Sequence, residues 1–331
     1  MELTKPYYYD SFRCIAGSCP DSCCKEWAVQ VDEVSAAYYR GLAGDLGDRL
    51  RQVLADEDGQ TLMTIEDGRC PMWRRDGLCR IQAELGEQAL CKTCREFPRL
   101  THDYGDFIEQ GLELSCPEAA RMILNAEAKP RLTIAVDGGE EPEYDMDAMA
   151  VLKATRERAL SLVNREEIPG QELLALLLLY GCQAQAELDG EEEITFDPEA
   201  ELDFGRELAG EGDFSGILTF FQSLEILTPQ WQQLLQSAGA PRMGKELRPL
   251  LRYFVERYWL QAVSDYDLYC RVKFIIVSCL VIGSLDADPV TAAQSFSKEI
   301  ENSLDNVEAI LDASYSHPAF TDAALLGLLL K

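Results

Sequence analysis

The sequence Cys14-Ile-Ala-Gly-Ser-Cys19-Pro-Asp-Ser-Cys23-Cys24, at residues 14–24, brings four thiols together in one short stretch. Thiols packed this densely are either oxidised to disulfides or held by a shared metal. Which of these occurs decides how the first third of the chain folds. Outward from this stretch the sequence adds five more cysteines, so nine of the twelve lie before residue 117: Cys14, Cys19, Cys23, Cys24, Cys70, Cys79, Cys91, Cys94 and Cys116.

Several features favour metal ligation over disulfides for these nine cysteines. A chain of 331 residues can bury a large core and does not need disulfides to hold it together. The first residues show no basic segment followed by an apolar one, so we expect no signal peptide and a cytoplasmic protein with reduced thiols. Nine is an odd number, and a disulfide between the adjacent Cys23 and Cys24 would strain the backbone.

The spacing of the thiols favours a [4Fe–4S] cluster, with zinc as the alternative. Zinc sites usually show two CxxC pairs, or one pair with two histidines. Here only Cys91 and Cys94 form a CxxC pair, and the chain has only two histidines, His102 and His317. Iron–sulfur clusters accept less regular spacing. One four-ligand site leaves five thiols over, so a second site and additional structural thiols both remain open.

Charge and hydropathy exclude two classes of partner. The formal net charge of −28 would repel nucleic acid phosphates, so we expect no DNA or RNA partner. The same charge favours solubility and attracts cationic groups such as lysine side chains. The longest apolar run, residues 274–285, is too short to span a membrane and is typical of a buried core helix.

The patterns along the chain predict a mainly α protein with a small β-hairpin, divided into a cysteine-rich metal module at residues 1–128, a linker or short strand at 129–146 and a helical domain at 147–331. Within the module we expect helices over 32–54, 80–97 and 117–128. A hairpin is expected over 61–79, with Asp76-Gly77 as its turn and Cys70 and Cys79 near its two arms.

The helical domain is predicted from helical periodicity and from prolines near the expected boundaries. The three cysteines in this part fall in apolar segments and are expected to be small buried hydrophobes: Cys182, Cys270 and Cys279. The predicted helices cover 147–165, 170–188, 198–210, 214–226, 229–238, 245–263, 266–284, 290–313 and 318–330.

Common enzyme motifs are missing. The chain has no GxGxxG or Walker sequence, and its two histidines give no credible Ser/His/Asp order. The radical S-adenosylmethionine signature CxxxCxxC is absent, because Cys24 follows Cys23 directly. Nor does the chain alternate strands and helices as a Rossmann-type methyltransferase does.

The cysteines and their neighbours carry a family resemblance over roughly the first 125 residues. It rests on Tyr7-Tyr-Tyr-Asp-Ser-Phe-Arg-Cys14, Ser22-Cys-Cys-Lys-Glu-Trp27, Gly68-Arg-Cys-Pro71, Asp76-Gly-Leu-Cys-Arg-Ile-Gln82, Leu90-Cys-Lys-Thr-Cys-Arg-Glu-Phe-Pro-Arg99 and Leu114-Ser-Cys-Pro-Glu-Ala-Ala120. The segment resembles CxxxCxxCC-type zinc- or iron-chelating domains and, more specifically, the flagellin lysine-N-methylase family. The resemblance implies an enzyme that transfers methyl groups from S-adenosylmethionine to lysines of flagellin, with an iron–sulfur or other metal site at the nine cysteines.

The residues themselves do not identify a catalytic base or a cofactor site. Lysine methylation requires a neutral amine, which a carboxylate or tyrosine can help to provide. The candidates are also explained by ordinary packing or by ion pairing: Tyr7, Tyr8, Tyr9, Asp103, Tyr104 and Asp106 for the amine, Arg74, Arg75, Arg95 and Arg99 for a methionine carboxylate, His102 as a metal ligand, and Trp27 and Trp73 as shields of the metal. A non-enzymatic metal chelator, or an iron–sulfur protein of electron transfer or sensing, is the rival interpretation.

Overall fold

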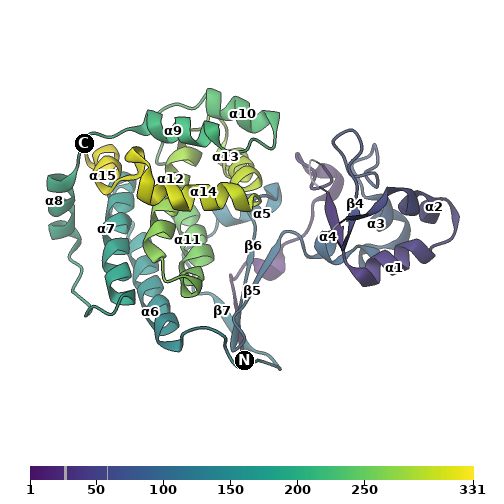
Figure 1. Cartoon of the computed structure of the whole chain (residues 1–331), viewed down its shortest axis with the longest axis horizontal. Coiled ribbons are helices and arrows are strands. Elements are labelled where there is room, and N and C mark those ends of the chain that lie inside the picture. Colours follow the sequence, from purple (N-terminus) through teal and green to yellow (C-terminus); the bar gives the residue numbers. More distant parts are fainter. Residues whose placement is uncertain (26–27, 58) are drawn as a thin grey trace.

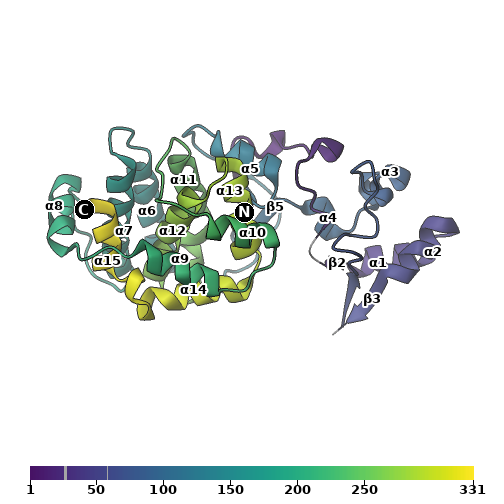
Figure 2. The ribbon, with the colours of Figure 1, turned by 90° about the horizontal axis from the view of Figure 1, so that it is seen from above.

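The computed structural model describes residues 1–25, 28–57 and 59–331, and it forms two lobes that lie side by side (Figures 1 and 2). A small lobe has its own hydrophobic core, formed by residues between Val29 and Cys91. A large, mostly helical lobe has a second core, which includes Tyr9, Phe12 and residues from Phe107 onward. The chain therefore enters the small lobe after its first residues and returns to the large lobe before residue 107. The fold is mainly α, as predicted.

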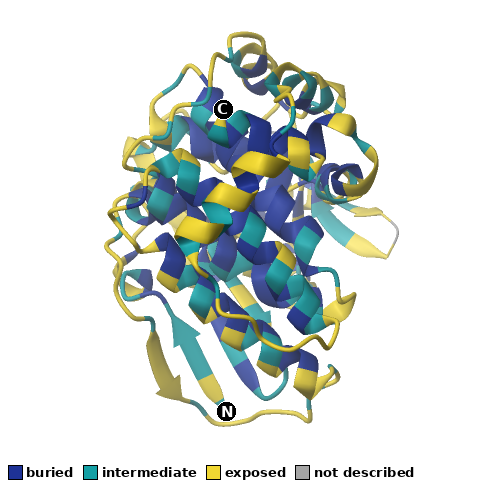
Figure 3. Ribbon diagram, turned by 90° about the vertical axis from the view of Figure 1, so that its left-hand side faces the viewer, coloured by how far each residue is buried: buried dark blue, intermediate teal, exposed yellow. Residues whose placement is uncertain are grey.

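Two apolar helices form the centre of the large lobe. Helix α12 (Leu268–Ser284) is buried along almost its whole length and packs against α7 (Gly170–Leu188). Helices α6 (Met146–Val163), α11 (Leu247–Tyr258), α14 (Leu304–Ser316) and α15 (Asp322–Leu330) surround this pair. Figure 3 shows buried residues concentrated in these central helices and exposed ones on the outer turns.

Most of the predicted helices of this lobe are confirmed with small shifts at their ends. Pro117, Pro198, Pro229 and Pro289 each stand in the first turn, where a proline costs no intrahelical hydrogen bond. The remaining helices are α5 (Pro117–Leu124), α8 (Pro198–Leu208), α9 (Phe214–Ser223), α10 (Pro229–Gln236) and α13 (Pro289–Phe296). Among the described residues, no helix has both the length and the apolar content needed to cross a bilayer.

Three predicted helices are interrupted. The helix expected over 318–330 is the 3-10 turn η6 (Pro318–Phe320) followed by α15. The helix expected over 245–263 ends in the 3-10 turn η4 (Trp259–Ser264). The helix expected over 290–313 is divided into α13, the π-helical segment η5 (Ser297–Glu301) and α14. Ser303 begins α14 by accepting a hydrogen bond from the Asn306 amide, so the side chain of Ser303 fixes the new start.

A four-stranded sheet covers one end of the large lobe and was largely missed from the sequence. Its order is β5 (Arg99–Asp103), β6 (Phe107–Leu112), β1 (Glu2–Lys5) and β7 (Leu132–Ala135). Strand β1 pairs in parallel with β6 and antiparallel with β7, so Leu3 faces both Ile108 and Ile134. Strand β7 lies in the stretch expected to be a linker or short strand.

The small lobe holds the short elements of the cysteine-rich region. The helix expected over 32–54 is two helices, α1 (Glu33–Gly41) and α2 (Gly44–Val53), because the residue that ends α1, Leu42, has an extended backbone. The helix expected over 80–97 is α3 (Arg80–Leu85), the 3-10 turn η3 (Glu87–Ala89) and α4 (Lys92–Glu96).

The regular hairpin of the small lobe lies earlier than predicted. Strand β4 (Gln60–Met63) pairs with β3 (Leu54–Glu57) on one side and with β2 (Val29–Val31) on the other. The predicted turn at Asp76-Gly77 does form, with Gly77 at a φ of 78°. It is flanked only by a single antiparallel bridge between Trp73 and Cys79 rather than by full strands.

The contact between α7 and α12 gives a test of the fold. A methyl group added at Gly181 would lie 2.6 Å from Val272 Cγ1. We therefore expect Gly181→Ala to lower the free energy of unfolding by about 1–3 kcal/mol, because the two central helices would have to move apart. Denaturant titration measures this. Gly41→Ala is the control, since no atom lies within 4 Å of its added Cβ. Equal stability of the two variants would contradict this packing.

Candidate metal centre

Six thiols line one cavity in the small lobe. They come from separate stretches of the chain: the loop that precedes β2, the loop after β4, the residue that begins α3, and the first turn of α4. The other lining residues are apolar or aromatic, so the cysteine thiols are the main metal-binding groups of the cavity. The thiols are those of Cys23, Cys24, Cys70, Cys79, Cys91 and Cys94, and the remaining lining residues are Val29, Tyr39, Met63, Met72, Ile81, Leu90 and Phe97.

The first three of these sulfurs interact directly with one another. Hydrogen bonds from the Cys23 and Cys70 thiols lower the pKa of Cys24 to about 3, and the guanidinium of Arg69 adds to this effect. The same interactions, together with burial, raise the pKa of Cys23 and of Cys70. Cys70 Sγ also lies 3.4 Å from the thioether sulfur of Met63. This group therefore holds one thiolate readily and offers several soft donor atoms.

The CxxC pair forms the second part of the cavity wall. Cys91 stands immediately before α4 and is buried, whereas Cys94 lies within α4 and is exposed. A hydrogen bond from Cys94 lowers the pKa of Cys91 to about 7. Cys79 occupies the corresponding position before α3, and its charge interacts with those of Cys24 and Cys91. The structure thus brings together sulfur atoms from four separate stretches of the chain.

The other three predicted ligands form a separate group between the lobes. Cys116 stands directly before α5 of the large lobe, and its charge interacts with those of Cys19 and Cys14. Cys14 and Cys116 both interact in the same way with Cys23, which connects this group to the cavity. Cys14, Cys19 and Cys116 are not among the residues that line the cavity. The nine candidates therefore divide into six and three.

The six thiols of the cavity are suitable ligands for a thiophilic metal. Their side chains do not have the geometry of a formed metal site. All twelve cysteines are free thiols. In the described part of the chain, no three His, Cys, Asp or Glu side chains stand in the geometry of a formed metal site. The cavity has about 30 Å³ open to the centres of water-sized groups, more than the ~10–15 Å³ that one water needs. A single metal ion fits that space, whereas a four-iron cluster requires the walls to move apart.

The structure places the other candidate residues away from the cavity. His102 lies on β5 and lines a different cavity, so its proposed role as a ligand beside the cysteines is not supported. The Arg99 guanidinium stacks over the ring of Phe12. Trp73 is covered by Arg69 and does not line the cavity, and Trp27 lies outside the described residues.

Further candidates have ordinary partners or positions. Arg74 pairs with Asp76, and Arg95 donates to the Leu90 carbonyl. The Tyr7 hydroxyl accepts a hydrogen bond from the amide of Glu127. Cys270 and Cys279 are buried as predicted, but Cys182 is exposed on the outer face of α7, so the prediction for Cys182 is wrong.

Asp21 joins the cysteine loop to the large lobe and was not identified from the sequence. Its carboxylate accepts a hydrogen bond from Gln294 (2.7 Å) and pairs with Lys298 (3.1 Å) and Lys25 (2.5 Å). Burial raises the pKa of Asp21, but these partners outweigh that effect and hold the pKa below its usual value. Its only signal in the sequence is its place between Cys19 and Cys23. Arg69, which favours the Cys24 thiolate, was also missed.

The fold and this centre define a mainly helical protein with a thiol-lined cavity in a small lobe. The chain is 33% identical over 136 residues to the flagellar biosynthetic protein FliU of Salmonella muenchen, covering 38% of this chain and 78% of that protein. It is 32% identical over 132 residues to the lysine-N-methylases of Salmonella typhimurium and Salmonella choleraesuis. These matches cover 38% of this chain and 33% of each methylase, so the similarity spans about a third of the methylases' length.

No family model and no solved structure matches the chain. The similarity to FliU nevertheless extends over more than two thirds of that protein. The chain belongs to the flagellin lysine-N-methylase family.

The division of the nine cysteines gives a test of the metal centre. We expect Cys94→Ser to lower the bound metal per chain by at least about tenfold, because an outer-wall ligand of the cavity is lost. Elemental analysis of anaerobically purified protein measures the metal, and visible absorption separates iron–sulfur from zinc. Cys182→Ser is the matched control, since that thiol is exposed on α7. Equal metal content in both variants would exclude the cavity as the binding site.

The contacts of Asp21 give a second test. Asp21→Ala should lower the free energy of unfolding by about 1–2 kcal/mol and speed proteolysis of residues 13–25, because the contacts from Lys298 and Gln294 to the loop are lost. Timed proteolysis followed by mass spectrometry measures the cleavage rate. Asp10→Ala serves as the control, because Asp10 pairs with Lys5 on the surface. Unchanged cleavage in the Asp21 variant would show that these contacts do not hold the loop.

Proposed function

We propose that this chain methylates lysine side chains of a protein, with flagellin as the substrate and S-adenosylmethionine as the methyl donor, and that the thiol-lined cavity holds an iron–sulfur cluster or a metal ion. The observation that carries this proposal is the combination of family membership with six thiols that line one cavity. Two of the relatives are named lysine-N-methylases and a third a flagellar biosynthetic protein, which supports lysine methylation linked to the flagellum.

The reaction makes defined demands on the protein. The lysine nitrogen attacks the methyl group, a carbon–nitrogen bond forms, and the carbon–sulfur bond of the donor breaks with its electron pair going to sulfur. Bound S-adenosylmethionine supplies the electrophilic methyl group. The amine must lose its proton first, which a desolvated site with a carboxylate or tyrosine favours. The protein must also align amine, carbon and sulfur.

In this proposal the metal stabilises the fold of the small lobe and takes no part in the methyl transfer. Methyl transfer to an amine by displacement needs no metal. Cys23, Cys24, Cys70, Cys79, Cys91 and Cys94 are the residues that would hold one. A metal bound by several of them cross-links loops that are distant in sequence, and such binding energy contributes to folding. The net charge of −28 favours the approach of lysine-bearing segments.

Coexpression with flagellin tests the function. We expect lysines of flagellin to gain mass equal to one or more methyl groups when this chain is present. Mass spectrometry of intact flagellin and its peptides measures the gain. A chain with Cys94→Ser should give a reduced gain, whereas Cys182→Ser should leave it unchanged. Circular dichroism of both variants shows whether each is folded.

The rival function is a metal chelator or iron–sulfur protein without transferase activity, and the six thiols of the cavity favour it equally. An unmodified flagellin in the presence of folded, metal-loaded chain would exclude the methylation proposal and leave this rival. Binding of S-adenosylmethionine to the purified protein, measured by calorimetry, distinguishes the two in the absence of flagellin.

A further inference from the structure

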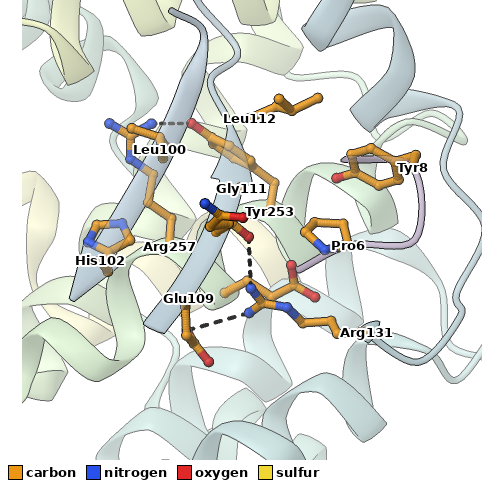
Figure 4. Close-up of a pocket in the computed structure, with 12 residues that line it drawn as sticks. Pro6, Tyr8, Leu100, His102, Glu109, Gly111, Leu112, Arg131, Tyr253 and Arg257 are labelled. Atoms are coloured by element: carbon orange, nitrogen blue, oxygen red, sulfur yellow. Dashed lines mark hydrogen bonds and ion pairs between the residues drawn. The ribbon is translucent and has the colours of Figure 1, made fainter. Parts of the chain in front are cut away.

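A second cavity lies in the large lobe, where the four-stranded sheet meets α11 (Figure 4). The sheet provides one wall, α11 provides another, and the turn after β1 provides the rim. Figure 4 shows Tyr8 and Pro6 on one side of this space and His102 and Arg257 on the other. The polar side chains that line it are Tyr8, His102, Glu109, Gln110, Arg131, Tyr253, Glu256 and Arg257.

Several charges in this cavity are already neutralised within the protein. Glu109 forms two hydrogen bonds of 2.7 Å with Arg156 and lies 3.4 Å from Arg131. Arg257 lies 3.2 Å from Glu301 and donates to the Tyr253 hydroxyl at 2.6 Å. These groups hold the walls of the cavity in place and do not require a ligand.

Two side-chain atoms of the lining residues lack a hydrogen bond in the described part of the chain, although another nitrogen of Arg131 donates to the Thr4 and Gln110 carbonyls. His102 Nε2 and Arg131 Nε are buried without a hydrogen bond. Glu256 and Tyr8 also line the cavity, and both are partly exposed. Burial raises the pKa of Glu256, and the charges of Arg131, Arg156 and Arg252 offset part of that effect. A buried polar atom left unpaired costs about 1–3 kcal/mol, so two such atoms in one cavity indicate a ligand.

The side chains that line the cavity include both an acceptor and donors of hydrogen bonds. Glu256 can accept hydrogen bonds from an ammonium group, whereas Arg131 Nε and the Tyr8 hydroxyl can donate to a carboxylate. A simple cation would leave these donors unpaired, and a simple anion would face the charge of Glu256. The space open to water-sized centres is about 30 Å³, which corresponds to roughly two to three water sites and suits a small head group.

We propose that this cavity binds the zwitterionic α-amino carboxylate head of an amino-acid ligand, with Glu256 receiving the ammonium group and Arg131 and Tyr8 the carboxylate. Either a free amino acid or the methionine end of S-adenosylmethionine presents this chemistry. The assignment to S-adenosylmethionine rests on the proposed methylation.

The cavity is also connected to the cysteine loop. Tyr253 and Arg257 both contact Glu301, which ends the π-helical segment η5. Lys298 in the same segment pairs with Asp21 in the cysteine loop. The cavity beside α11 and the cysteine loop therefore both contact the segment Ser297–Glu301.

Calorimetry with three probes tests the site: methionine, S-adenosylhomocysteine, and methylthioadenosine, which keeps the nucleoside but lacks the amino-acid head. Glu256→Gln and Tyr8→Phe should each weaken S-adenosylhomocysteine binding by about tenfold or more, because a charge-assisted or direct hydrogen bond is lost. Methylthioadenosine binding should not change. Glu157→Gln, at an exposed position of α6, is the control. We expect both variants to fold, because each substitution keeps the size of the side chain. Thermal unfolding checks this.

The outcomes separate this site from the proposed function. Unchanged S-adenosylhomocysteine affinity in both cavity variants, or an equal loss with methylthioadenosine, would overturn the head-group site even if flagellin is methylated. Methionine binding that depends on Glu256, without flagellin methylation, would support the site as one for a free amino acid and overturn the methylation proposal alone. If neither methionine nor S-adenosylhomocysteine binds, the cavity holds only water and the site is excluded.

Discussion

The stability of the small lobe depends on the interactions among its cysteine thiols. Its core is modest, and two of its buried members are themselves cysteines, Cys70 and Cys91. The elements around the cavity are short: α3 and α4 have six and five residues, and each begins directly after a cysteine. Helices this short are not stable on their own, so their positions must come from tertiary contacts. A metal bound by several of these thiols, as proposed above, would supply such contacts between loops that are distant in sequence.

The same sulfur-bearing loop also connects the lobes. Asp21 reaches Gln294 and Lys298, and the segment that carries Lys298 ends at Glu301, whose carboxylate contacts Tyr253, Tyr258 and Arg257. The π-helical segment η5 thus carries a residue of each contact, Lys298 toward the loop and Glu301 toward the core. Segments of this kind often occur at functional sites. Here the segment joins the metal centre to the cavity beside α11.

Local signals in the sequence predicted much of the fold but little of the site's detail. Apolar periodicity and prolines located the helices of the large lobe because both act within a few residues. The strands β1, β5 and β6 were missed because they are short and their pairing is set by partners far along the chain. The gathering of the cysteines was expected, but their division into six and three depends on the lobe boundary. Asp21 and Glu256 could not be identified from the sequence, because the residues around them come from distant parts of the chain.

The pairing of β1 has a consequence for the order in which the chain is made. Strand β1 leaves the ribosome before both of its neighbours, β6 and β7, which follow more than a hundred residues later. The core of the small lobe, between Val29 and Cys91, is synthesised in that interval and can fold before β1 pairs with its neighbouring strands. The thiol-lined cavity can thus form before the four-stranded sheet of the large lobe is complete. The nascent chain would then carry a folded small lobe while the large lobe is still being synthesised.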